Sequence, residues 1–119
     1  MNAVYDWNLL LDAQGGPHHV GNFCDAPYLY DQAADTLTPR AVLKALRHFA
    51  HWIRPGAVRI GVTRYTDQLD VTAFRNPDGS LALVLLNMAE QKLPVQLRVE
   101  DQLGSFILPP RSLTSGLMR

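Results

Sequence analysis

Histidine and cysteine are the side chains of this sequence best suited to binding a metal or attacking a substrate. His18 and His19 are adjacent in the chain. His48 and His51 are separated by about one helical turn, a spacing compatible with a shared metal ion. Because no cysteine or carboxylate stands at ligand spacing from the loop pair, we predict no metal site. Cys24 has no evident partner base, which favours a small buried residue over a nucleophile.

Composition excludes several other classes of function. The chain has 119 residues, 47% of them hydrophobic and 18% charged, which is typical of a folded domain rather than a disordered tail. Eleven basic and eleven acidic residues balance, so neither a nucleic-acid surface nor an anionic membrane is indicated as a partner. One cysteine permits no internal disulfide. No apolar stretch approaches the roughly 20 residues of a membrane span, and no signal peptide is visible.

The first half of the sequence predicts a strand, a long loop and a helix. Residues 4–11 form a short apolar run that leads into Gly15-Gly16-Pro17, which is typical of a buried strand followed by a loop. The loop extends to residue 27, and residues 28–30 predict a brief strand. Thr38 is the expected N-cap of the helix and Pro39 its first residue. One apolar stripe recurs at helical spacing, formed by Val42, Leu43, Leu46, Phe49, Ala50 and Ile53.

After Arg54-Pro55-Gly56, which ends the helix, the pattern changes to short strands. We expect strands at residues 58–62, 69–75, 81–86, 95–99, 106–108 and 113–117, with a tight turn at residues 76–79. The run 81–86 is continuously apolar, as in a strand buried on both faces. This spacing of strands and turns predicts an antiparallel β-sandwich at residues 56–119. Residues 1–55, a strand–loop–helix unit, make sense as the incomplete last unit of a (β/α)₈ barrel.

Several blocks, in order along the chain, resemble one known family. The first are DWNLLLD at residues 6–12 and GGPHHVGNFCDAP at residues 15–27. They are followed by RHFAHWIRPGAVRIG at 47–61, VTAFRNPDGS at 71–80 and VLLN at 84–87. Together these blocks resemble the end of the barrel and the β-sandwich of glycoside hydrolase family 30, the glucosylceramidase-like family. The mainly β chain with one long helix fits that interpretation.

The resemblance implies a retaining glycosidase of β-linked glucosides such as glucosylceramide, with no metal or organic cofactor. It places Trp7 and Asn22 in the pocket for the terminal sugar, with Phe23 beside Asn22. An indole face can pack on a pyranose, and an amide can both donate to and accept from hydroxyls. Glucosylceramidases usually carry Asn-Trp where this chain has His18-His19, so His19 replaces a platform residue at the pocket mouth. Without the resemblance, Trp7 would be interpreted as core and Asn22 as a turn residue.

The carboxylates do not support a self-contained glycosidase. Retaining hydrolysis needs two carboxyl groups about 5–5.5 Å apart, which this family supplies as two glutamates on earlier barrel strands. The only glutamates here, Glu90 and Glu100, fall in the predicted sandwich. Asp6 and Asp25 lie where capping of loop backbone is the commoner role. We therefore predict no catalytic residue in this chain.

Three interpretations remain open from the sequence. The first is a C-terminal fragment of a family 30 glycosidase, whose partners are the rest of the barrel and a β-glucoside. The second is a non-catalytic carbohydrate-binding or structural module. The third is a chain that completes a barrel in trans. In each case the stripe that includes Leu46, Phe49 and Ile53 would be uncovered in the chain alone, and we expect self-association through it. The cellular compartment stays open, since family members are secreted, periplasmic or lysosomal.

Overall fold

The computed structural model describes residues 5–21 and 24–119 of the chain. The chain divides into two compact units, residues 1–47 and residues 48–119. No helix in the described part of the chain is long and apolar enough to cross a membrane.

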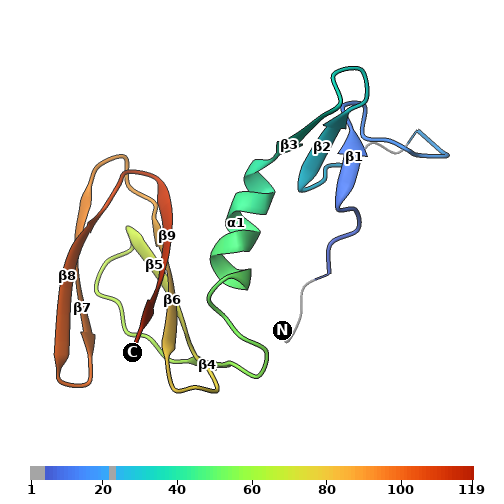
Figure 1. The fold of residues 1–119 in the computed structure, drawn as a ribbon. Coiled ribbons are helices and arrows are strands. Elements are labelled where there is room, and N and C mark those ends of the chain that lie inside the picture. Colours follow the sequence, from blue (N-terminus) through green and yellow to red (C-terminus); the bar gives the residue numbers. More distant parts are fainter. Residues whose placement is uncertain (1–4, 22–23) are drawn as a thin grey trace. The chain divides into compact units, whose positions relative to one another are not determined.

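The first unit contains a three-stranded sheet of short strands (Figure 1). Strand β1 (Leu10–Asp12) pairs in parallel with β2 (Tyr28–Asp31), and β2 pairs antiparallel with β3 (Thr36–Pro39). The predicted strand at residues 28–30 is confirmed. The predicted strand at 4–11 is wrong over residues 5–9, because β1 begins only at Leu10. Asp6 Oδ1 accepts the Trp7 N–H at 2.8 Å, and this local bond competes with strand pairing.

The predicted start of the helix is also wrong. Thr38 and Pro39 belong to β3, where they pair with Leu29 and Tyr28 of β2. Proline has no N–H to donate to a strand ladder, and it is tolerated here because β3 is an edge strand of the sheet. The next residue, Arg40, donates its N–H to the Pro27 carbonyl at 2.9 Å, and α1 (Ala41–Ala50) begins after it. Pairing with β2 therefore overrides the local capping signal.

The β2–β3 hairpin is closed by side-chain hydrogen bonds at its tip. Asp31 Oδ1 accepts the N–H groups of Ala33 and Ala34 at 2.9 and 3.1 Å. The Tyr30 hydroxyl donates to Asp35 Oδ1 at 2.9 Å, and this bond to a carboxylate raises the pKa of Tyr30. Asp35 itself adopts a positive φ of 48°. The tip is thus an ordered turn rather than a featureless polar stretch.

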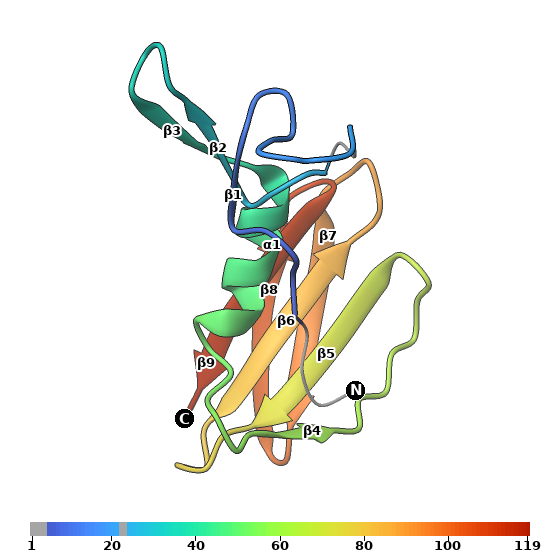
Figure 2. The same cartoon turned by 90° about the vertical axis from the view of Figure 1, so that its right-hand side faces the viewer.

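The second unit is an antiparallel β-sandwich. Its larger sheet has the strand order β4 (Val58–Ile60), β5 (Leu69–Arg75), β6 (Leu81–Asn87) and β9 (Ser112–Met118), seen side by side in Figure 2. The smaller layer is the hairpin of β7 (Leu93–Val99) and β8 (Gln102–Leu108). The prediction of an antiparallel sandwich is confirmed, although β7 and β8 are longer than the sequence indicated.

The core lies between these two layers. It is a cluster of buried side chains contributed by both sheets, namely Leu69, Ala73, Leu83, Leu85, Val95 and Leu108. Strand β6 is buried from residue 82 to residue 85, which confirms the prediction of two covered faces for these residues, whereas Leu86 is 36% exposed. On β7, Val95 is buried whereas Gln96 and Arg98 are exposed, as the alternation predicted.

The β5–β6 turn is built around a buried asparagine. Asn76 is 3% exposed, and its amide donates to the Trp52 carbonyl and to Ser80 Oγ, both at 3.0 Å. Its Oδ1 accepts the Arg54 N–H at 3.0 Å, which ties the segment after α1 to the turn. Gly79 has φ +85° in the tight turn that was predicted at residues 76–79. Hydrogen bonds donated by Ser80 Oγ and N–H lower the pKa of Asp78.

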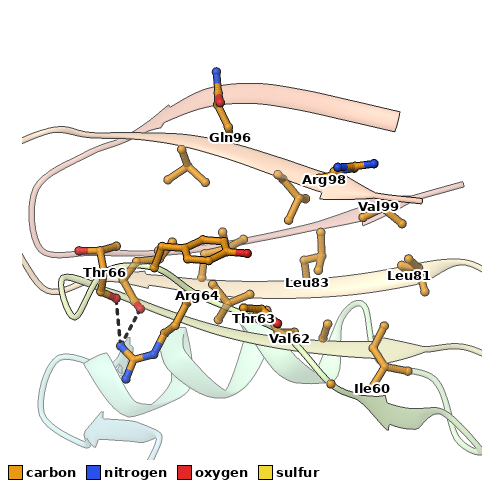
Figure 3. A pocket seen from close by; sticks show the side chains of 18 of the residues that line it. Ile60, Val62, Thr63, Arg64, Thr66, Leu81, Leu83, Gln96, Arg98 and Val99 are labelled. Carbon is orange, nitrogen blue, oxygen red and sulfur yellow. Dashed lines mark hydrogen bonds between the residues drawn. The ribbon is translucent and has the colours of Figure 1, made fainter. Parts of the chain in front are cut away.

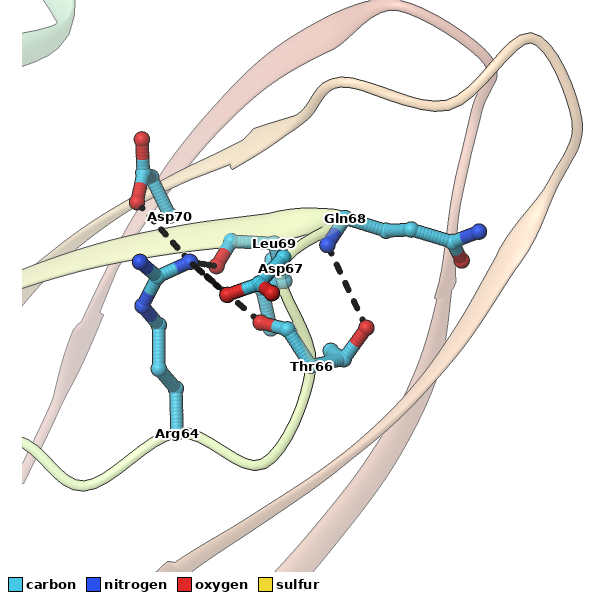
Figure 4. Close-up of polar contacts among 6 residues, drawn as sticks. All are labelled: Arg64, Thr66, Asp67, Gln68, Leu69 and Asp70. Atoms are coloured by element: carbon cyan, nitrogen blue, oxygen red, sulfur yellow. Dashed lines mark hydrogen bonds and ion pairs between the residues drawn. The ribbon is translucent and has the colours of Figure 1, made fainter.

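The segment before β5 is held by one arginine (Figure 4). Arg64 Nη1 donates to the carbonyl oxygens of Leu69 and Thr66, at 3.0 and 3.3 Å. The same nitrogen lies 3.3 Å from Asp70 Oδ1 and 3.8 Å from Asp67 Oδ1. The guanidinium group thereby fastens this segment to the first residues of β5.

Candidate functional site

In the sequence, one predicted sugar-binding residue precedes β1 and the other three follow it. Trp7 comes before the strand and is 88% exposed. His19 is exposed in the β1–β2 loop (residues 13–27). Asn22 and Phe23 lie outside the described residues. In the structure of this chain Trp7 is therefore not a core residue, and its indole is accessible.

The β1–β2 loop leaves β1 through a turn organised by Asp12. Asp12 Oδ1 accepts the N–H groups of Gln14 and Gly16, at 2.9 and 2.8 Å. The Asp12 N–H donates to the Gly16 carbonyl at 2.8 Å, and the Gly15 N–H donates to the Asp12 carbonyl at 3.0 Å. Gly15 needs its φ of +78° to close this turn.

The loop returns to β2 through a second set of bonds. The Tyr28 N–H donates to the Leu9 carbonyl at 3.1 Å. Asp25 Oδ1 accepts the Ala26 N–H at 2.9 Å and lies 3.5 Å from Arg40 Nη2. Asp25 is therefore a loop anchor, as the sequence suggested, and Asp6 similarly accepts a backbone N–H from its neighbour. Both aspartates thus accept a hydrogen bond from the backbone N–H of the next residue.

The two glutamates occupy separate turns of the sandwich. Glu90 forms an ion pair with Arg111, which joins the loop after β6 to the loop before β9. Glu100 lies between β7 and β8 with a positive φ of 54°, and its carbonyl accepts Arg98 Nε at 3.2 Å. Across residues 5–21 and 24–119, no group of three or more His, Cys, Asp or Glu side chains could hold a metal ion.

A cavity of about 630 Å³ lies in the sandwich, between the two layers (Figure 3). Its walls are mainly apolar side chains of β5, β6 and β7, including Val71, Leu83 and Leu97, and the segment 60–66 closes one side. Arg98 and Glu100 are the charged residues that β7 and its following turn add to the lining. Glu100 is the one carboxylate among the lining residues of this cavity, whereas retaining glycoside cleavage uses two.

Comparison with protein families identifies both parts of the chain. Residues 1–53 match the glycosyl hydrolase family 30 TIM-barrel domain, and residues 56–115 match the glycosyl hydrolase family 30 beta sandwich domain. The chain belongs to glycoside hydrolase family 30. The mainly β fold, with the end of a barrel followed by an antiparallel sandwich, is that of the family 30 domains.

Relatives of this family 30 chain are much longer. Two from Caenorhabditis elegans, both with glucosylceramidase in their names, are 39% and 38% identical over 97% and 87% of this chain. The lysosomal acid glucosylceramidase of Mus musculus is 34% identical over 81% of it. The chain spans only 24%, 21% and 19% of the lengths of these relatives.

Two solved structures also match nearly all of this chain over only about a quarter of their own length. The crystal structure of SrfJ from Salmonella typhimurium superposes with a TM-score of 0.91 at 37% identity, over 96% of this chain and 26% of its own. The endo-β1,6-glucanase BT3312 superposes with a TM-score of 0.84 at 30% identity, over 92% of this chain and 25% of its own.

Proposed function

We propose that these residues are the C-terminal part of a retaining β-glucosidase of glycoside hydrolase family 30. Residues 1–55 would supply the last strand–loop–helix unit of its barrel, and residues 56–119 a sandwich that braces it. The order of the two family matches along the chain carries this proposal. It is supported by the lengths of the relatives and by the lack of any glutamate in residues 1–55.

Within the intact enzyme, cleavage would proceed by double displacement through a glycosyl-enzyme intermediate, with both glutamates supplied by the rest of the barrel. Trp7 would pack on the face of the terminal sugar and Asn22 would bond its hydroxyls. His19 and Phe23 would lie at the mouth of the pocket. The loop that follows a barrel strand faces the active site in this architecture, which supports the assignment of the β1–β2 loop to the substrate. A β-glucoside is the substrate class, in line with relatives named as glucosylceramidases.

The experiment compares two proteins on a chromogenic β-glucoside. The 119-residue chain should show no turnover above background, and a longer polypeptide that also carries the barrel should be active. In the longer protein Trp7→Ala should lower kcat/KM about tenfold, corresponding to a loss of about 1.4 kcal/mol. Tyr65→Ala, at an aromatic residue that is 95% exposed in the sandwich, is the control and should leave activity unchanged. Turnover by the short chain alone, abolished by Asp6→Asn or Asp25→Asn, would contradict the proposal.

The exposed stripe of α1 leads to a second expectation, about the chain alone. Val42, Leu46 and Phe49 are 39%, 36% and 40% exposed, and no residue of α1 is buried. We expect the 119-residue chain to self-associate and to bind a hydrophobic dye, because an uncovered apolar stripe favours association. Light scattering after size exclusion measures this. The double variant Leu46→Lys, Phe49→Lys should be monomeric, Lys44→Ala should behave as wild type, and a monomeric wild type without dye binding would contradict the expectation.

A further inference from the structure

Backbone bonds and one aspartate side chain hold each end of the β1–β2 loop. At the return end, the Tyr28 N–H donates to the Leu9 carbonyl and the Arg40 N–H to the Pro27 carbonyl, and Asp25 caps only the N–H of its own neighbour, Ala26. At the departure end, the Asp12 side chain accepts two of the N–H groups that close the turn. Asp12 is thus the side chain on which the path of the loop after β1 depends.

The surroundings of Asp12 leave its carboxylate little freedom. Gly16 is buried, and a Cβ built on it would lie 3.0 Å from Asp12 Oδ2 and 3.4 Å from Oδ1. The shorter of these approaches is tighter than ordinary van der Waals contact, so the carboxylate packs directly against the Gly16 backbone. The N–H of Gly16 would lose its acceptor if the carboxylate were removed. The turn therefore uses an acceptor at position 12, and a side chain at position 16 would have to displace that carboxylate by a few tenths of an ångström.

The direction in which the chain leaves this turn decides where the following residues lie. Pro17, His18 and His19 come immediately after Gly16, and the predicted sugar ligand Asn22 follows them. Binding groups have to be held within about 0.5 Å of the productive geometry, and they depend on surrounding hydrogen bonds for that precision. By fixing the direction in which the chain leaves the turn, Asp12 would hold these binding groups in place without touching the sugar.

We propose that Asp12 is a positioning residue for the β1–β2 loop, which sets substrate affinity through the backbone of the turn at residues 12–16 rather than by contact with substrate. This inference rests on the proposed function for the identity of the ligand, a β-glucoside. The other part of the inference, that Asp12 controls the position of the residues after Gly16, can be tested on the 119-residue chain by itself. Asp12→Asn keeps the Oδ1 acceptor and should retain the loop, whereas Asp12→Ala removes it.

The hairpin tip offers a matched control. Asp31 Oδ1 also accepts two backbone N–H groups, those of Ala33 and Ala34, in a turn that carries no predicted ligand. Asp31→Ala therefore removes the same kind of side-chain cap and should cost similar stability. A difference between the Asp12 and Asp31 variants in substrate affinity cannot then be attributed to the loss of a capped turn.

The first measurement uses the imidazole NMR resonances of His18 and His19 in the 119-residue chain. Asp12→Ala should shift them clearly, whereas Asp12→Asn and Asp31→Ala should leave them near their wild-type positions. Unchanged resonances in Asp12→Ala would overturn the proposal whatever the activity of the longer protein.

The second measurement uses the longer polypeptide that carries the barrel, with a chromogenic β-glucoside as the probe. Asp12→Ala should raise KM about tenfold with kcat within about twofold, because ground-state and transition-state binding are lost together. Asp12→Asn should restore KM, and Asp31→Ala should not change it. A wild-type KM in Asp12→Ala would overturn the inference, while an inactive wild-type protein would instead refute the proposed function.

Discussion

Replacing Leu108 with alanine is expected to lower the free energy of unfolding of the sandwich by about 3 kcal/mol. Leu108 is 1% exposed at the end of β8, opposite Leu93 of β7, and belongs to the core cluster between the two layers. Truncation removes its buried methyl groups and leaves a space that the flanking strands cannot fill completely. Urea denaturation measures the loss, and the melting temperature should fall by roughly 15 °C for a domain of this size.

The same strand supplies the control for this substitution. Leu103 lies on β8 as well but is 65% exposed, because it belongs to the outward face that also carries Ile107. Leu103→Ala should change the free energy of unfolding by no more than about 0.5 kcal/mol. Equal losses from the two variants would mean that the hairpin of β7 and β8 is not packed on the larger sheet in solution.

Asn87→Ala is expected to have an effect of similar size for a different reason. Asn87 is fully buried at the end of β6, and its amide donates to the Gln91 and Pro109 carbonyls at 3.0 and 2.7 Å. Its Oδ1 accepts the Ala89 N–H at 2.9 Å. Alanine would leave these backbone groups without their partner, so we expect a loss of about 3 kcal/mol in urea denaturation.

Two further variants test this account of Asn87. Gln96→Ala, at an exposed amide on the outer face of β7, should be close to neutral. Asn87→Asp keeps the shape of the side chain but cannot donate both bonds, and burial would raise the pKa of the new carboxyl group. The folded state of Asn87→Asp then binds a proton more tightly than the unfolded state, so its stability should fall as pH rises above about 4. A flat pH profile with wild-type stability would contradict the role of the two donated bonds.

Strands were predictable where both flanking turns and alternation were strong. The bounds predicted for β5 match the structure, because its alternation ends at the Asn-Pro-Asp-Gly turn. Strand β8 was predicted only from residue 106, since Gly104 and Ser105 are weak strand formers. Pairing with β7 over the full register from Gln102 to Leu108 overrides that local preference. The predicted start of the helix was wrong for the same reason, because pairing in the β2–β3 hairpin decided the conformation of Thr38.

The polar groups that organise the fold were less visible in the sequence. Asn87 bonds a carbonyl 22 residues away, at Pro109, and such a partner cannot be deduced from local pattern. Trp7 and Asn22 entered as candidates through family resemblance, not through any local chemical signature. Asp12 did carry a signal, since an aspartate before a Gly-Gly pair at a strand end is typical of a side-chain-closed turn.

The arginine that holds the segment before β5 also affects how the chain behaves among other copies. Strand β4 pairs with β5 only from residue 73 to residue 75, which leaves the first residues of β5 without a strand neighbour on that side. An uncovered strand edge is a template for intermolecular pairing and aggregation. By occupying the Leu69 carbonyl and placing charge beside Asp70, Arg64 blocks that template. Arg64 thus places a bonded, charged side chain at an edge that β4 is too short to cover.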